Sequence, residues 1–120
     1  MRNPDNQVYL HHILDAAAKI DRFLQAVDQA RFRSDDIVQS AVMYQVQIIG
    51  EAVRHVTREF RAHYPEIPWQ EIAGMRSRLV HDYFGIDLQA AWEAATEDVP
   101  RLVIQIRKIL DELASGELRG

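Results

Sequence analysis

The stretch Val42-Met43-Tyr44-Gln45-Val46-Gln47-Ile48-Ile49-Gly50-Glu51-Ala52-Val53-Arg54 decides the fold class of this chain. Its apolar side chains recur at alternating steps of four and three, which is the spacing of one face of an α-helix. This repeat predicts a long helix with an apolar seam suited to antiparallel or dimeric helix packing. The complete seam consists of Val42, Val46, Ile49, Val53, Val56 and Phe60.

A polar stripe follows the same helix, about 100° around its axis from the seam. Such a stripe is usually a solvated surface with local ion pairs, and Glu51 and Arg54 have the spacing for one. The alternative is that the stripe lines a groove that receives phosphate. Its members are Gln47, Glu51, Arg54, Arg58 and Arg61.

Similar periodicity predicts the elements before and after this helix. A helix is expected over residues 5–28, and Ser34 is expected to cap the central helix, which runs to about residue 62. The prolines in 63–69 predict a loop. Further helical segments are expected over 69–73, over 75–83 and, capped by Asp87, over 88–114, with a kink or break at Pro100.

These elements predict an all-α protein, an up-and-down bundle of four to five helices. With 120 residues and 48% hydrophobic content, the chain is long enough for one domain with a core. We expect a single helical domain over residues 1–114 and a flexible tail over 115–120.

Composition excludes several classes of protein. The chain has no cysteine, which excludes disulfides and thiolate metal sites. Residues 1–5 lack the apolar core of a signal peptide, and charges interrupt every apolar run, so we expect a cytoplasmic protein that does not bind membranes. The net charge of −4 argues against a general nucleic-acid coating protein. Residues 54–81, however, carry +2 and three of the five histidines, so an anionic ligand is expected to bind there.

The segment Arg76-Ser77-Arg78-Leu79-Val80-His81-Asp82-Tyr83 concentrates the chemistry of the chain in an R-x4-H-x-Y pattern. Histidine transfers protons near neutral pH, the arginine fork fits phosphate, and a phenol donates a hydrogen bond or accepts a covalent group. On an ideal helix Tyr83 falls within about 20° of Arg76, but His81 lies about 140° away. One helix therefore does not bring all three side chains together.

Completion of the site by a second copy has a chemical reason. Metal-free RNA cleavage requires a base for the 2′-hydroxyl proton, an acid for the leaving 5′-oxygen and a cation beside the phosphate. Two copies of His81 across a symmetric dimer would supply the acid and the base, and Arg76 would supply the cation.

The chain resembles the HepT-like branch of the HEPN ribonuclease toxins. The resemblance implies an all-helical homodimer that cuts RNA without a metal or other cofactor, with Arg76 and His81 as the catalytic residues at the dimer cleft. Ser77 follows the motif arginine where many HEPN nucleases have an amide. The matching segments are Ile48-Ile49-Gly50-Glu51-Ala52, Ile67-Pro68-Trp69, Ile72-Ala73-Gly74-Met75-Arg76 and Leu79-Val80-His81-Asp82-Tyr83, followed by Asp87, Trp92 and Pro100-Arg101-Leu102.

The resemblance also implies a partner, an MntA-like nucleotidyltransferase antitoxin that silences the toxin by transferring AMP to the motif tyrosine, here Tyr83. Such a pair is a toxin-antitoxin system of type VII. Four further residues are candidates for RNA or phosphate binding or for support of the site: Glu51, Arg54, Ser77 and Arg78.

Two other interpretations stay open. In the first, the chain is a catalytically weak helical module that binds a nucleotidyltransferase and presents Tyr83. The acidic net charge and Ser77 motivate this interpretation. Alternatively, it would be a structural dimeric bundle in which Arg76, His81 and Glu51 form a buried ion network.

Overall fold

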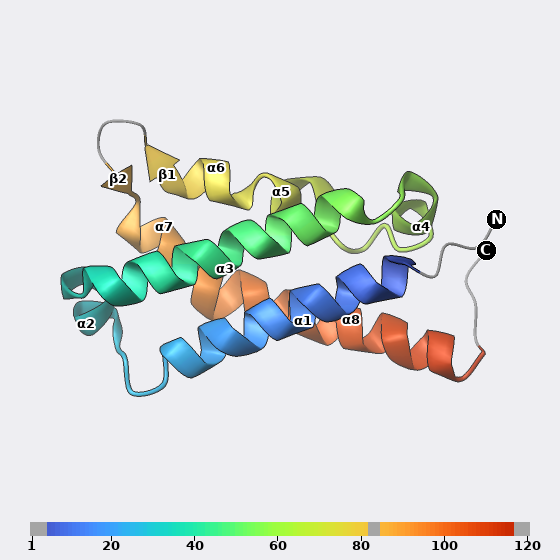
Figure 1. Cartoon of the computed structure of the whole chain (residues 1–120), viewed down its shortest axis with the longest axis horizontal. Helices are drawn as coiled ribbons and strands as arrows, with labels where there is room; N and C mark the ends of the chain where they lie inside the picture. The colour runs from blue at the N-terminus through green and yellow to red at the C-terminus, as the bar shows by residue number, and fades with distance from the viewer. Residues whose placement is uncertain (1–4, 82–84, 117–120) are drawn as a thin grey trace.

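The computed structural model describes residues 5–81 and 85–116 and confirms the all-α prediction. Three long helices form the body of the molecule, and shorter elements lie beside them and at their ends (Figure 1). The long helices are α1 (Asp5–Phe23), α3 (Asp36–His55) and α8 (Val99–Ala114). Helix α1 contacts both α3 and α8, and it runs antiparallel to each of them (Figure 1).

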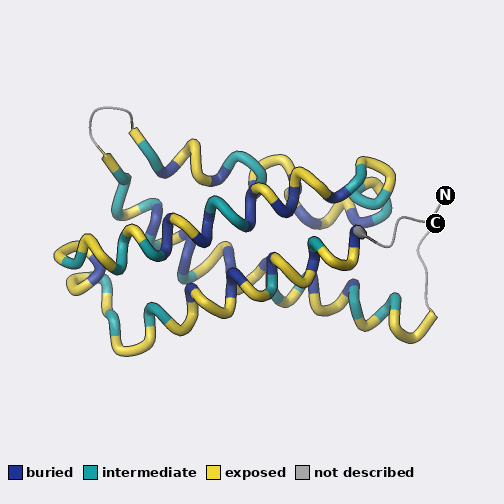
Figure 2. The backbone as a smooth tube through the Cα atoms, viewed as in Figure 1, coloured by how far each residue is buried: buried dark blue, intermediate teal, exposed yellow. Residues whose placement is uncertain are grey.

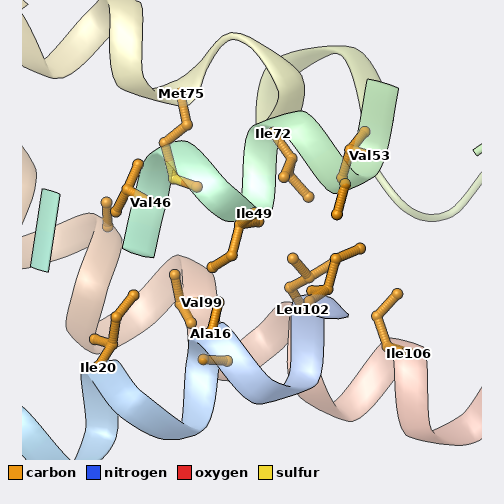
Figure 3. Close-up of a cluster of buried hydrophobic side chains, with 14 of the residues drawn as sticks. Ala16, Ile20, Val46, Ile49, Val53, Ile72, Met75, Val99, Leu102 and Ile106 are labelled. Carbon is orange, nitrogen blue, oxygen red and sulfur yellow. The ribbon is translucent and has the colours of Figure 1, made fainter. Parts of the chain in front are cut away.

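The predicted apolar seam of α3 lies at the centre of the core. Val42, Val46, Ile49 and Val53 are fully buried, and Val56 is 2% exposed. Phe60 is only half-buried and belongs to a different helix. Buried positions recur along each long helix at the spacing of one face (Figure 2). The seam therefore packs within the chain, against α1 and α8, and the close-up in Figure 3 shows Ile49 among their side chains.

The boundary between the first two long helices differs from the sequence prediction. Helix α1 ends at Phe23, short of residue 28, and Ala26 then adopts a left-handed φ of 60°. An unpredicted short helix, α2 (Gln29–Ser34), follows. Asp35, not Ser34, caps α3, because its carboxylate accepts hydrogen bonds from the Ile37 and Val38 amides at 3.1 Å.

The central helix is also shorter than predicted. It ends at His55, and α4 (Arg58–Ala62) is a separate helix capped by the Thr57 hydroxyl. The Thr57 amide, which a continuous helix would use internally, donates instead to Oδ1 of the buried Asn6 at 3.0 Å. The Val53 carbonyl, which a continuous helix would pair with the Thr57 amide, instead accepts the Val56 amide at 3.1 Å and Arg61 Nη2 at 2.7 Å. Competing side-chain partners thus divide the predicted helix in two.

Residues 69–81 and 85–86 form the structure that we call the arm. It contains α5 (Trp69–Ala73), α6 (Met75–Leu79) and the strands β1 (Val80–His81) and β2 (Gly85–Ile86), which pair antiparallel. The expected helix over 75–83 is therefore wrong beyond Leu79. The β-branched Val80 is extended, with φ −113° and ψ 128°, and Gly85 supplies a φ of 77° where β2 begins.

The last helical run begins at Asp87, whose carboxylate caps α7 (Leu88–Glu93) as predicted by accepting the Ala90 amide at 3.0 Å. A π-helical turn, η1 (Ala94–Asp98), then connects α7 to α8. The Val99 amide bonds to the Ala94 carbonyl in this turn, immediately before Pro100, which has no amide proton to donate. The predicted interruption near Pro100 is thus confirmed.

Candidate functional site

A cavity of about 170 Å³ lies where α3 meets the junction of α5 and α6. It brings together three of the residues singled out from the sequence, Glu51, Arg54 and Ser77, with the motif residue Arg76. Two guanidinium groups thus share the cavity with one carboxylate, which leaves a formal excess of one positive charge. The complete lining is Gln47, Gly50, Glu51, Arg54, Ala73, Arg76 and Ser77.

The polar stripe of the central helix supplies one wall of this cavity. The Gln47 amide donates to Glu51 Oε1 at 3.2 Å. The expected ion pair between Glu51 and Arg54 is absent, because Arg54 Nη2 donates at 2.6 Å to the carbonyl oxygen of Ala73 instead. Gln47, Glu51 and Arg54 of the stripe thus line the cavity, whereas Arg58 and Arg61 lie on α4 and do not.

The short helix α6 carries the opposite wall. Met75 and Leu79 are 2% and 4% exposed, and the side chain of Met75 points toward the core near Val46 (Figure 3). This anchoring turns Arg76 and Ser77 toward the cavity, and both are exposed. Arg76 makes no hydrogen bond or ion pair with any residue in the described ranges, so its guanidinium is available for an anion.

Arg78 has a structural contact of its own. It is exposed, does not line the cavity, and donates from Nη2 to the Glu71 carbonyl at 3.3 Å. The bond ties α6 back to α5. This contact fits a role for Arg78 in supporting α6 better than direct contact with phosphate.

His81 lies outside the cavity, in the two-stranded β-sheet. Its side chain is 54% exposed, and its Nε2 is 3.9 Å from Oδ2 of Asp87. That distance allows a weak electrostatic contact with a side chain that also caps α7. The imidazole is thus more than half exposed and lies near one carboxylate.

Within a single copy of the chain, Arg76, His81 and Glu51 form no buried ion network. Arg76 and Glu51 are exposed, His81 is more than half exposed, and no ion pair joins any two of the three. Tyr83, the predicted AMP acceptor, lies outside the described residues. The helical geometry expected for His81 does not apply either, since the residue lies on a strand.

A larger apolar groove of about 790 Å³ lies between α1, η1 and α8. Among the described residues, only Asp21 and Arg107 bring charge to its lining, and neither Arg76 nor His81 reaches it. Among the described residues, no group of three or more His, Asp or Glu side chains could hold a metal ion. In the same ranges, no helix is long and apolar enough to cross a membrane.

A known family model covers most of this chain. The family model described as "Ribonuclease HepT-like" matches residues 13–109, which includes α3, the arm and most of α8. The chain belongs to the HepT-like ribonuclease family. The residues around the cavity, from Gln47 to Ser77, all fall within the match.

Members of the HepT-like family from thermophiles are similar over most of the chain. A probable ribonuclease HepT of Thermococcus cleftensis is 38% identical over 84% of this chain and 92% of its own length. A candidate RNase of Caldanaerobacter subterraneus is 36% identical over 87% of this chain and 93% of its own. No solved structure matches significantly.

One relative is longer. A protein of Methanocaldococcus jannaschii, whose name gives it a gamma-glutamylcyclotransferase and a candidate RNase, is 39% identical over 91% of this chain. The chain spans about half of that relative, 49% of its length.

Proposed function

We propose that this HepT-like chain is an endoribonuclease that cleaves RNA without a metal ion, with Arg76 and His81 as its catalytic residues. The observation that carries the proposal is the cavity in which Arg76, which pairs with no residue in the described ranges, lies beside Arg54 and Ser77. The names of the relatives, which include ribonucleases, support the same reaction. Guanidinium groups and a hydroxyl are suitable partners for the oxygens of a phosphodiester.

The proposed reaction is an attack of the ribose 2′-oxygen on the adjacent phosphorus. One imidazole accepts the 2′-hydroxyl proton, and a protonated imidazole donates a proton to the 5′-oxygen as its bond to phosphorus breaks. Arg76 stabilises the extra negative charge on the phosphate oxygens. Because a single His81 cannot serve as both base and acid in one step, a second copy supplies the other imidazole.

A homodimer that uses the exposed face of α3 would complete such a site. Ile37, Ala41, Tyr44 and Ile48 follow each other at steps of four, three and four. Ile37 is 79% and Tyr44 61% exposed, while Ala41 and Ile48 are half-buried. This exposed seam is distinct from the buried one, and it has the spacing of a helix-packing surface.

The charges at the two ends of α3 favour an antiparallel partner. Asp35 and Asp36 lie at its N-terminus, and Arg54 and His55 in its last turn. Two copies of α3 that cross near Tyr44 about a two-fold axis perpendicular to the helices place the acidic end of each helix beside the basic end of the other. The cavities then lie on both sides of that axis.

Cross-linking with single cysteines tests this dimer, because the chain has no cysteine of its own. Tyr44→Cys should yield a disulfide-linked dimer on mild oxidation. Ile104→Cys, on the 70% exposed Ile104 of α8, is the matched control and should stay monomeric in denaturing gels. Efficient cross-linking at residue 104 alone would place the interface on α8 and not on α3. A protein that sediments as a monomer at micromolar concentration would contradict the dimer.

RNA cleavage in the presence of EDTA tests the reaction. The purified protein should cut RNA, and Arg76→Ala and His81→Ala should each reduce the rate by about 10²–10⁴-fold. Both side chains are exposed, so both variants should fold. Intact RNA, or cleavage that begins only when a divalent metal is added, would rule out the mechanism.

We further propose that the chain is the toxin of a cytoplasmic toxin-antitoxin pair and that an MntA-like nucleotidyltransferase modifies Tyr83. The phenolic oxygen attacks the α-phosphorus of ATP, loses its proton to a base and displaces pyrophosphate. A bulky anionic adduct two residues from His81 would block the site and repel RNA phosphates. Co-expression with the transferase should add one or more AMP units in intact-mass spectra, and Tyr83→Phe should prevent the addition.

A second candidate function is a weakly catalytic module that binds the nucleotidyltransferase. The observation that favours it is the position of His81 outside the cavity that holds Arg76. A protein modified at Tyr83 that cuts no RNA in either state would support this module. Strong cleavage by the unmodified protein would exclude it.

A further inference from the structure

The junction between α5 and α6 lacks side-chain caps of its own. Gly74 ends one helix and begins the other, with φ −94° and ψ 7°, and neither helix begins with a side-chain cap. Each helix has only five residues, which is too few for independent stability. The direction in which α6 leaves this junction, and thus the position of Arg76, depends on contacts with the rest of the chain.

Helix α3 makes a direct side-chain contact with this junction. Arg54 Nη2 donates to the carbonyl oxygen of Ala73, the last residue of α5, at 2.6 Å. The acceptor lies 19 residues away along the chain and three residues before Arg76. A guanidinium at a carbonyl that ends a helix is also favourable to the local backbone dipole.

Gly50 makes that contact possible. It lies one turn before Arg54, and a Cβ atom at position 50 would be 3.1 Å from the same Ala73 oxygen. That distance is tighter than ordinary van der Waals contact, and the neighbour is backbone, which cannot simply rotate away. The absence of a side chain at Gly50 thus lets α5 approach α3 closely enough for Arg54 to reach its end.

We propose that Arg54 is a positioning residue that sets the place of Arg76 by holding the Ala73 carbonyl, and that Gly50 provides the space for this contact. The inference rests on the proposed ribonuclease function. It separates two roles that look alike in the sequence: Arg76 contacts the phosphate, and Arg54 fixes the turn from which Arg76 projects. A displacement on the order of 1 Å at a catalytic group costs about 100-fold in rate.

The competing role for Arg54 is direct phosphate binding, and the two roles predict different kinetics. A lost phosphate contact raises KM and lowers the salt dependence of binding by about one unit of slope. A lost positioning contact lowers kcat and leaves KM and the salt slope nearly unchanged. Gly50→Ala changes no charge, so it removes no cation that could contact the phosphate.

Steady-state cleavage of a short RNA by the full chain decides between them. Arg54→Met should lower kcat by about 100-fold and Gly50→Ala by a smaller factor, each with KM within about twofold of the original, and the double variant should lose no more than Arg54→Met alone. Arg22→Met, which removes an exposed arginine near the end of α1, is the charge-matched control and should keep the original kcat. A folded Gly50→Ala protein with full kcat, or an Arg54→Met protein altered only in KM, would overturn the proposal.

A structural readout separates this inference from the proposed function. The carbonyl ¹³C resonance of Ala73 should shift in Arg54→Met and not in Arg22→Met, and the amides of α6 should exchange faster. These signals do not require activity, so they test the contact even if the original protein cuts no RNA. An unchanged Ala73 resonance in Arg54→Met would overturn the contact, and this exposed substitution remains available if Gly50→Ala fails to fold.

Discussion

The core and the arm of this protein are built in different ways. The core consists of three helices of 16 to 20 residues, and their buried faces follow a regular spacing of three and four. The arm consists of two helices of five residues and two strands of two residues. The core could form from its apolar pattern alone, whereas the arm is held by contacts with α3, among them Arg54 with Ala73 and the buried Met75.

The difference explains where the chemistry is found. Every residue of the R-x4-H-x-Y motif that the structure describes lies on the arm, and the long helix α3 supplies the other wall of the cavity. A short, externally supported segment can hold exposed polar side chains in an arrangement that a regular helix does not permit. The core provides a rigid scaffold, and the arm holds the functional side chains in place on it.

The largest effect on stability is expected in the core. Ile49→Ala removes a fully buried side chain from the centre of the seam and should lower the free energy of unfolding by about 2–5 kcal/mol. Urea denaturation followed by circular dichroism measures it. Ile104→Ala, at a 70% exposed position of α8, is the control and should change the value by less than about 0.5 kcal/mol. Similar losses in both variants would mean that the seam is not the source of stability.

A smaller effect is expected where the core helix α3 gives way to α4. The Thr57 hydroxyl accepts from the Phe60 amide and from Asn6 Nδ2, both at 3.2 Å, and Asn6 is buried. Thr57→Ala should therefore cost about 1–2 kcal/mol in the same denaturation assay. Thr57→Ser keeps the hydroxyl and should lose much less. Equal losses would show that the methyl group, and not the cap, matters.

In the arm, Trp69→Phe should act locally. It removes the hydrogen bond of 2.9 Å from the indole Nε1 to the Tyr64 carbonyl, at a cost of about 1 kcal/mol. Hydrogen exchange should accelerate in α5 and α6 and stay unchanged in the middle of α3. Trp92→Phe is the matched control, because the Trp92 indole donates to no described residue. Uniform acceleration along the chain would contradict an arm that opens separately from the core.

The smallest effect is expected at the N-terminus of α3 and depends on pH. A hydrogen bond from the Val38 amide, assisted by Arg31, lowers the pKa of Asp35 below its ordinary 3.8. The carboxylate therefore stabilises the fold above that value and loses its contribution as the pH falls through the lowered pKa. Asp35→Asn keeps an acceptor but does not titrate. The difference in melting temperature between the two proteins should be present at pH 7 and shrink below pH 4. A difference that does not change with pH would show that the charge of Asp35 is not its cause.

Sequence patterns predicted the core more completely than the arm. The seam of α3, the cap at Asp87 and the interruption near Pro100 depend on residues close together in the chain, and the structure confirms them. The division at Thr57 could not be predicted, because the partner of its amide is Asn6, 51 residues away. The cap by Asp35 was missed because Ser34 is an equally good capping residue by type.

The candidate site was likewise predicted in part. Motif spacing identified Arg76 and His81, and the polar stripe identified Glu51 and Arg54 as candidates. The sequence offered no reason for Arg54 to reach Ala73 instead of Glu51, since that choice depends on the close approach that Gly50 permits. The strand at His81 was also missed, because a short segment after a helix has no periodicity of its own.

By itself, the sequence determined that this chain folds as a helical protein around one apolar seam and that its chemistry is concentrated between Arg76 and Tyr83. Both features are local, because they depend on side-chain type and on spacing within a few turns. The tertiary structure alone decided that Arg54, Arg76 and Ser77 share a cavity and that His81 lies outside it. The physical reason is that short elements take their direction from contacts distant in sequence, which no local pattern encodes.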